Sequence, residues 1–252
     1  MKLHPLLILP ATALALYTAG SAQASLAVYT FQQGANGYAA AVDAGIVQGA
    51  PTTPLGAAPS LSVDLGSFSA GVPSVSAMLL RFDEVFGSGP RQVPFTASIT
   101  KATLTLSVND AGSGFQLFDM LSPWLDSITW DGSFGTPGFP APGVGAASTP
   151  VTSAGNDSNA QNVPVGLLTL DVTASLLAQQ AGGLPGYGWT LLPWPTAGWN
   201  GVDLDTSDAA DPLSRPLLTI TVPEPGAAAL LLLGLAALRL RRREPPRGQG
   251  TA

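Results

Sequence analysis

Hydrophobic and polar residues alternate along several short stretches of this chain. In residues 103–108 the apolar positions are Leu104, Leu106 and Val108, and each is preceded by Thr or Ser. Residues 218–222 show the same alternation. Successive side chains of a β-strand point to opposite faces, so each stretch predicts a strand with one buried face. Other stretches predict further strands at residues 26–31, 61–65, 77–82, 115–121, 166–172 and 187–192.

One short helix is predicted among these strands. Asp171 or Thr173 can cap a helix over residues 174–180, because a side-chain oxygen accepts a hydrogen bond from the first free N–H groups. Gly182 or Gly183 can end it, since glycine takes the left-handed conformation that closes a helix.

The order of these elements predicts the fold class. Clusters of turn-forming residues separate the strands, for example at residues 109–114. Eight or nine short strands, one brief helix and no alternation of strands with helices predict an all-β fold, an antiparallel β-sandwich or jelly roll. Residues 25–221 are enough to form one domain with one core. Within it, residues 132–161 are rich in Gly, Pro, Ala, Ser and Thr and predict a long surface loop.

The first 24 residues are typical of a secretory signal peptide. Lys2 is followed by 12 mostly apolar residues from Leu6 to Tyr17, and small residues surround Ala24, after which we expect cleavage. The alternative is a permanent membrane helix. This run is shorter than the ~20 residues that a spanning helix needs, which favours the signal peptide.

The C-terminal region carries a second apolar stretch. A helix over residues 226–240 would be about 22 Å long at ~1.5 Å per residue, which is short for a hydrocarbon layer of ~30 Å. The sequence therefore predicts a marginal transmembrane helix. Basic residues at the C-terminal end of such a helix place the tail, residues 244–252, in the cytoplasm and the preceding domain outside; they are Arg239, Arg241, Arg242 and Arg243.

The order of parts in residues 222–243 resembles a known sorting signal. Pro223, Glu224 and Pro225 precede the apolar stretch, and the arginine cluster follows it. This arrangement is similar to the PEP-CTERM signal of Gram-negative bacteria. The resemblance implies that an exosortase in the inner membrane cuts near Pro-Glu-Pro and passes the protein to the cell surface, in a setting of exopolysaccharide and biofilm production. An ordinary C-terminal anchor, the alternative, leaves Pro-Glu-Pro unexplained.

Charge and composition exclude several functions for the domain between these signals. Residues 25–221 contain fourteen acidic and four basic residues, a difference of ten negative charges, so nucleic acid is a poor partner. The chain has no Cys, and its one His, His4, lies in the predicted signal peptide. A mature chain without His and Cys cannot carry Ser-His-Asp or Cys-His catalysis, or the usual zinc sites.

Short motifs in the domain resemble an extracellular β-sandwich of the DNRLRE type, which is related to carbohydrate-binding modules. Their order along the chain is kept, although the Pro- and Gly-rich stretch after Trp130 departs from it. The resemblance implies a surface domain that binds carbohydrate. It rests on residues 28–34, 79–82, 99–106, 198–199 and 215–220, and on the pairs Pro123-Trp124 and Thr129-Trp130.

Residues 200–211 form the densest acidic segment of the domain. Carboxylates at alternate positions of a loop can converge on a hard cation, so a structural Ca²⁺ site is one interpretation of the segment; its ligands would be Asp203, Asp205, Asp208 and Asp211. The EF-hand pattern is not met, because Asp208 and Ser214 occupy the positions of its glycine and its bidentate Glu. A solvated acidic loop in which Asp caps turns is the interpretation that we favour.

Two tryptophans are candidates for stacking on sugar rings. Trp194 lies between two prolines and Trp199 follows a glycine, which favours exposure of both rings. The alternative is that they seal loops or the core, as we expect for Trp130 and Trp189. Arg81 is expected to pair with a carboxylate of a neighbouring strand.

These observations predict an exported, non-catalytic protein that binds or organises exopolysaccharide at the cell envelope or in the extracellular matrix. Its processing partners would be signal peptidase and exosortase, with a transient inner-membrane anchor and no cofactor beyond the possible Ca²⁺. One alternative is a polysaccharide-active enzyme that uses paired Asp carboxylates. The other is a purely structural or adhesive matrix protein. Aspartic protease chemistry is disfavoured, because neither residues 131–133 nor 205–207 match Asp-Thr/Ser-Gly.

Overall fold

The computed structural model describes residues 25–69, 72–132, 134, 138, 140–196 and 199–224. The predicted signal peptide, the predicted sorting helix with its arginines, Pro225 and the tail 244–252 lie outside the described residues. No helix in the described part of the chain is long and apolar enough to cross a lipid bilayer.

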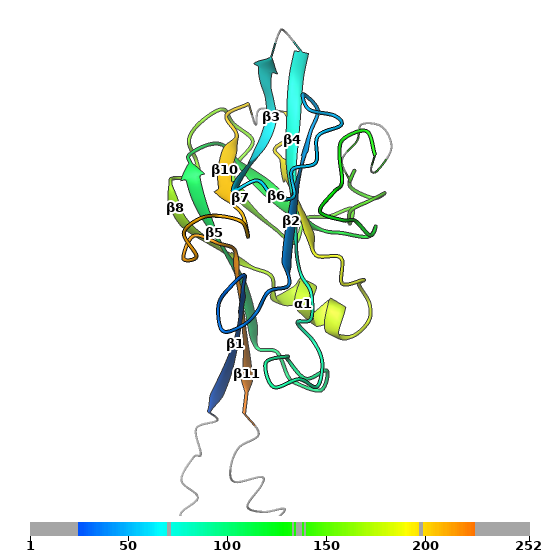
Figure 1. Ribbon diagram of the computed structural model, residues 1–252, viewed down its shortest axis with the longest axis vertical. Coiled ribbons are helices and arrows are strands. Elements are labelled where there is room, and N and C mark those ends of the chain that lie inside the picture. The colour runs from blue at the N-terminus through cyan, green and yellow to red at the C-terminus, as the bar shows by residue number, and fades with distance from the viewer. Residues whose placement is uncertain are drawn as a thin grey trace, which may run out of the picture. The chain divides into compact units, whose positions relative to one another are not determined.

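In the described residues the chain forms eleven strands and one α-helix, α1 (Thr173–Gln180) (Figure 1). The strands are β1 (Leu26–Gln32), β2 (Ala41–Val47), β3 (Ser60–Ser69), β4 (Val72–Phe82), β5 (Lys101–Asp110), β6 (Gly114–Asp119), β7 (Thr152–Gly155), β8 (Gly166–Asp171), β9 (Trp189–Pro193), β10 (Val202–Asp205) and β11 (Leu217–Pro223).

The strands form one curled antiparallel sheet. Its order is β1-β11-β5-β10-β3-β4-β9-β6-β7, while β8 pairs with β5 and β2 pairs with β4. Strand β3 joins the two halves of the sheet, because residues 60–63 pair with β10 and residues 64–69 pair with β4. The half that contains β5 and β11 can therefore turn back over the half that contains β4 and β9.

The main core lies between these two halves. Strand β5 contributes Leu104 and Leu106, and β4 contributes Met78 and Leu80, all fully buried in one hydrophobic cluster. The alternation predicted for residues 103–108 is confirmed, since its apolar side chains are buried and its hydroxyl side chains are not. The all-β, antiparallel fold is thus confirmed, and the facing halves are consistent with the predicted sandwich.

Loop residues cover the outer face of the half formed by β2, β4, β6 and β9. Trp124 packs there against Ile46 and Leu79, and Ala146 packs against Phe118. The prediction of a surface loop at residues 132–161 is therefore wrong in two places. Ala146 is fully buried, because the sheet offers apolar side chains on its outer face as well, and residues 152–155 form β7.

All eight predicted strand regions contain strands, with ends that differ by a few residues. The helix is confirmed as α1, and Asp171 accepts a hydrogen bond from the Thr173 N–H at 2.8 Å. The residue at the N-cap is Val172, which makes no side-chain cap, so neither predicted residue occupies that position. Strands β2, β7 and β10 were not predicted.

The first and last strands lie side by side. Leu26 of β1 pairs with Pro223 of β11, and the ladder continues to Gln32 and Leu217. Figure 1 shows the two strands as a ribbon at the lower end of the view. Both ends of the domain therefore leave it at the same edge.

Candidate functional site

The two tryptophans predicted to bind sugar differ in exposure. Trp199 is 41% exposed, and its indole N–H donates to the Thr196 carbonyl at 3.2 Å. Trp194 is half-buried and donates to the Ala154 carbonyl at 3.0 Å, which ties its loop to β7. Trp189 is a core residue with 2% exposure, as expected. Trp130 is only partly buried and packs against the loop-covered outer face.

The acidic segment at residues 200–211 is not the single loop that we expected. Val202 and Leu204 are fully buried, and this alternation makes residues 202–205 the strand β10 between β3 and β5. Its acidic residues, Asp203 and Asp205, therefore stand on the outer face of the sheet. The loop prediction was wrong because two buried apolar side chains outweigh the preference of Asp for turns.

The four predicted calcium ligands are spread over separate positions. The Asp205 carboxylate accepts hydrogen bonds from Ser107 and from Asn109, both at 2.7 Å. Asp211 accepts a hydrogen bond from the Leu213 N–H at 2.9 Å, as a turn-capping residue does. Nowhere in the described ranges do three or more His, Cys, Asp or Glu residues form a group that could hold a metal ion.

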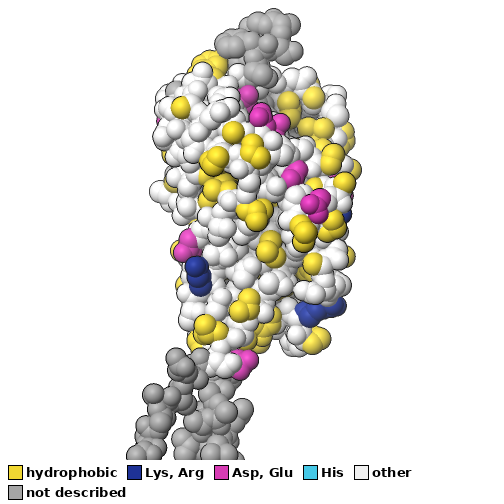
Figure 2. Space-filling model, turned by 90° about the vertical axis from the view of Figure 1, so that its left-hand side faces the viewer, with side chains coloured by type: hydrophobic (Ala, Val, Ile, Leu, Met, Phe, Trp, Pro, Cys, Tyr) yellow, Lys and Arg dark blue, Asp and Glu magenta, His cyan; other side chains and the backbone are white. Residues whose placement is uncertain are grey.

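The outer face of the half that contains β5 and β10 is acidic. Asp203 is opposite Asp110 in the β5 ladder, and Asp64 lies on the adjoining strand β3. Burial and the neighbouring Asp203 charge raise the pKa of Asp64. Figure 2 views the side on which β8 and β5 lie in Figure 1, and acidic side chains gather in the upper half of this view.

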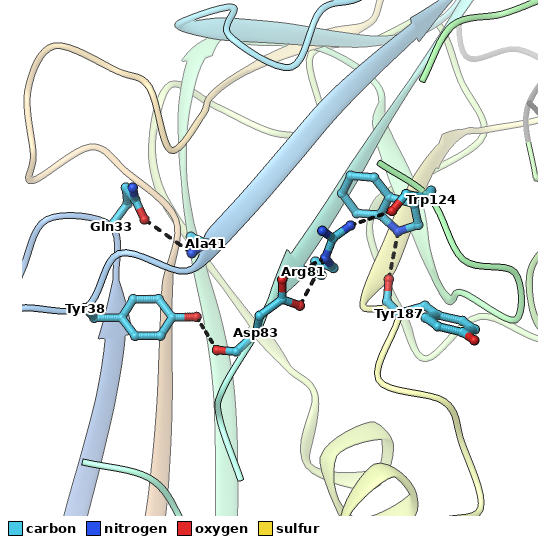
Figure 3. A network of polar contacts seen from close by, with 7 residues as sticks. All are labelled: Gln33, Tyr38, Ala41, Arg81, Asp83, Trp124 and Tyr187. Carbon is cyan, nitrogen blue, oxygen red and sulfur yellow. Dashed lines mark hydrogen bonds and ion pairs between the residues drawn. The ribbon is translucent and has the colours of Figure 1, made fainter. Parts of the chain in front are cut away.

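Arg81 lies at the centre of a polar network (Figure 3). It forms an ion pair at 3.0 Å with Asp83, which lies directly after the end of β4, so the prediction of a partner on a neighbouring strand was wrong. Arg81 also donates to the Trp124 carbonyl at 2.8 Å, and Trp124 donates to the Tyr187 carbonyl at 2.8 Å.

Two buried carboxylates lie elsewhere in the domain, and the sequence analysis did not single them out. Asp43 on β2 is 1% exposed and accepts a hydrogen bond from the Ser207 N–H at 2.7 Å. Burial raises its pKa to about 6. Asp119 on β6 accepts a hydrogen bond from the Ser175 hydroxyl of α1, and burial raises its pKa. Both contacts join a loop or helix to the sheet.

A pocket of about 570 Å³ opens beside β1. Its walls are β1, the β1–β2 loop and the loop that follows β4, and its lining residues are 28–31, 36–39, 84 and 89–92. Arg91 donates to the Asn36 carbonyl, which connects the two loops across the pocket. A side chain at Gly37 would collide with this guanidinium, so glycine permits the close approach.

The floor of the pocket is aromatic. The ring of Tyr38 lies edge-on to Phe31, with ring centroids 5.4 Å apart, and stacks on Phe82 at 6.4 Å. Its hydroxyl donates to the Asp83 carbonyl at 2.8 Å, as Figure 3 shows. Burial and the charges of Asp83 and Glu84 raise the pKa of Tyr38, so its phenol keeps its proton.

Sequence reasoning missed this pocket because its residues follow no common spacing. They come from three segments spread over residues 28–92, and the sheet brings these together. The available signal was local: the glycines at 34 and 37 and the Gly-Ser-Gly-Pro run at 87–90 predict tight turns beside β1 and β4.

No family model matches the chain, and no curated protein matches it. The two resemblances described above therefore stay predictions.

Proposed function

We propose that this chain is an exported surface protein of a Gram-negative bacterium, sorted by a PEP-CTERM signal, whose DNRLRE-like domain binds or organises exopolysaccharide without catalysing a reaction. The observation that carries the proposal is the position of the sorting motif. Strand β11 ends at Pro223, the first residue of Pro-Glu-Pro, so the predicted motif begins at the end of the last strand of the described residues.

The pairing of β1 with β11 supports this processing scheme. Signal peptidase would cut after Ala24, two residues before Leu26, and exosortase would cut near Glu224. Both cuts fall outside the described strands. A mature protein that is cut at both ends would keep its whole sheet. It could therefore stay folded after its release from the membrane.

The chemistry of the domain supports a binding role. Residues 25–221 hold no His and no Cys, and Asp43 and Asp119 are enclosed by the sheet and its loops. Neutral polymers are the better ligands, because ten excess negative charges repel acidic glycans unless divalent ions bridge them. Trp194 and Trp199 remain proposed sugar contacts, and Ca²⁺ a proposed bridging or structural ion.

One observation favours the enzyme alternative. Burial and the neighbouring Asp203 charge raise the pKa of Asp64, and a carboxyl group with a raised pKa can serve as the general acid in glycoside hydrolysis. Secreted protein that releases reducing sugar from exopolysaccharide, and loses this on Asp64→Asn, would establish the enzyme. Absence of any release supports the binding protein.

The sorting signal is tested in a host that produces exosortase. The full chain, with an epitope inserted at the exposed residue Asn159, is compared with a Glu224→Ala/Pro225→Ala variant and with Arg247→Ala as a control beyond the arginine cluster. We expect the wild type and the control to reach the cell surface, and the double variant to stay in the inner membrane at its full length. Equal release of all three, or cytosolic wild type, contradicts the proposal.

Binding is tested on the mature protein recovered from the surface or the medium. It is applied to an array of bacterial glycans with and without Ca²⁺. Binding to at least one glycan supports the proposal. Surface retention that is unchanged in an exopolysaccharide-deficient host, together with no binding on the array, would favour the structural or adhesive alternative.

A further inference from the structure

The pocket beside β1 is lined by two residues whose backbone conformation is uncommon elsewhere in the described chain. Asn36 and Glu84 have φ values of +51° and +59°, and they are the only non-glycine residues of the described chain with positive φ. Both line this pocket. Asn tolerates this conformation, but Glu adopts it at an energetic cost, and such strain is concentrated at binding and active sites.

The strained position of Glu84 is held by the residue that faces it. The Gln92 side chain donates to the Glu84 carbonyl at 3.1 Å and accepts from the Gly89 N–H at 2.9 Å. These contacts use the backbone of Glu84 and leave its exposed carboxylate at the pocket. The loop therefore fixes the backbone of Glu84 through these contacts, and none of them uses its carboxylate.

Each of the two loops is held by its own backbone hydrogen bonds. Tyr38 and Gly34 close the β1–β2 loop through the hydrogen bond from Gly34 N–H to Tyr38 O at 2.8 Å. In the second loop the Val93 N–H donates to Val85 O at 2.8 Å. Loops held by their own hydrogen bonds lose little conformational entropy when a ligand binds.

We propose that this pocket binds a short segment of a neutral glycan. The inference rests on the proposed function, and it names the site and the class of sugar. Tyr29 and Tyr38 supply aromatic rings at the pocket, which suit the apolar faces of sugar rings. Arg91, Asn36 and Glu84 supply planar groups with paired donors or acceptors, and such groups match neighbouring sugar hydroxyls.

The charges of the pocket select a neutral ligand. Arg91 and Glu84 are its two charged residues, of opposite sign, and they form no ion pair with each other. The pocket thus has no net charge, while the rest of the domain is strongly acidic. A uronic acid would gain one attraction to Arg91 but meet repulsion from Glu84 and from the whole domain.

The volume fits a short oligosaccharide. About 570 Å³ lies within the range of ~300–1,000 Å³ that is typical of small-molecule sites. The pocket is bounded on one side by β1, which among the described strands pairs with β11 alone and lies at the edge of the sheet. A polymer could therefore enter at this open edge of the sheet.

The decisive variant is Glu84→Gly. Glycine takes positive φ without cost, so this change relieves strain in the fold while it removes the carboxylate from the pocket. We expect the variant to be as resistant to urea as the wild type, or more so, and to bind neutral glycan at least tenfold more weakly. Unchanged affinity would mean that Glu84 serves the turn alone and would overturn the assignment.

A second pair of variants tests the role of the Arg91 guanidinium in binding. Arg91→Ala removes an exposed guanidinium of the pocket, and Lys101→Ala removes an exposed cation on β5 that does not line it. The probes are neutral gluco-, galacto- and manno-oligosaccharides of three to six units, with oligoalginate as the acidic comparison, titrated into mature wild-type and variant protein. We expect at least tenfold loss for Arg91→Ala and none for Lys101→Ala. Preference for oligoalginate contradicts the neutral class.

The outcomes separate the pocket from the wider proposal. If Trp199→Ala or Trp194→Ala abolishes binding while Glu84→Gly and Arg91→Ala do not, the domain binds glycan elsewhere and only this inference fails. If the wild type binds no glycan, the proposed function fails as well. Amide hydrogen exchange of the wild-type protein, measured with and without glycan, tests the site without any substitution. Bound sugar should slow exchange at residues 34–39 and 84–92, and unaltered exchange there would contradict the assignment.

Discussion

The guanidinium of Arg81 lies over the indole ring of Trp124, with its Cζ atom 4.5 Å from the ring centroid. The same guanidinium donates to the Trp124 carbonyl and is held by Asp83. One side chain on β4 therefore fixes both the ring and the backbone of the loop that covers the outer face of the sheet. The Asp83 carbonyl in turn accepts from Tyr38, so this network reaches the pocket floor (Figure 3).

Replacing Arg81 should destabilise the domain. Arg81→Ala removes a hydrogen bond from a charged donor and a cation–π contact, and we expect the free energy of unfolding to fall by about 2–3 kcal/mol. Urea unfolding followed by tryptophan fluorescence measures this. Lys101→Ala is the matched control, because Lys101 is exposed and should change stability by less than about 0.5 kcal/mol. Equal losses for the two variants would contradict this role of Arg81.

Two glycines with the same backbone conformation should respond differently to substitution. Gly188 and Gly182 have φ values of +73° and +74°. A Cβ atom at Gly188 would lie 2.2 Å from the Leu80 carbonyl oxygen, whereas at Gly182 it would have nothing within 4 Å. Gly182→Ala should therefore cost only the ~1–2 kcal/mol of the left-handed conformation.

Gly188→Ala adds a collision with the backbone of β4 to the same conformational cost. We expect little or no folded protein, or a loss of stability at least twice that of Gly182→Ala. Circular dichroism and the urea midpoint of both variants measure the difference. Similar midpoints would show that Gly188 and the β4 backbone at Leu80 can move apart freely.

The sequence pattern predicted the strands of the core because their apolar side chains recur at every second residue. Leu104, Leu106 and Val108 illustrate this, and the structure buries all three. The pattern failed for β2, where Asp43 and Gly45 occupy buried positions that a strand usually fills with apolar residues. It also failed for β10, where alternating Asp residues resemble a turn-rich loop although Val202 and Leu204 are buried.

The candidate pocket could not have been derived from local pattern. Tyr29, Asn36, Glu84 and Arg91 lie on three segments, and only the antiparallel arrangement places the loop after β4 next to β1. The left-handed conformation of Glu84 is equally invisible in the sequence, because a favourable hydrogen bond from Gln92 offsets an unfavourable intrinsic preference. The sorting signal is the opposite case, since its motif and apolar stretch are contiguous.

Ser175 should matter for stability although it lies on a short helix. Its hydroxyl donates to Asp119 and accepts from the Trp189 indole N–H at 2.9 Å. Ser175→Ala leaves both buried groups without this partner, and we expect a loss of about 2–4 kcal/mol in urea unfolding. Gln179→Ala removes only a 3.2 Å contact to the same hydroxyl and should cost less than about 1 kcal/mol. A smaller effect for Ser175→Ala than for Gln179→Ala would disprove this account.

Asp43 should make the domain less stable as the pH rises from about 4 to about 6. Burial raises its folded pKa to about 6, whereas a carboxyl of the unfolded chain has a pKa near ~3.9. Between these values the folded state binds more protons than the unfolded state, so the free energy of unfolding falls with rising pH. The loss is complete above the folded pKa and amounts to about 2–3 kcal/mol.

The Asp43→Asn variant isolates this contribution, because Asp64 and Asp119 also have raised pKa values and act in the same direction in both proteins. Protonated Asp43 and Asn are nearly isosteric, so the two proteins should have similar stability at pH 4. At pH 7.5 the variant should be more stable by about 2–3 kcal/mol, since it no longer buries a charge beside Asp208. Urea unfolding at several pH values measures the gap, with the exposed Asp126→Asn as control. A gap between Asp43→Asn and wild type that does not change with pH would show that Asp43 is ionised as readily in the folded domain as in the unfolded chain.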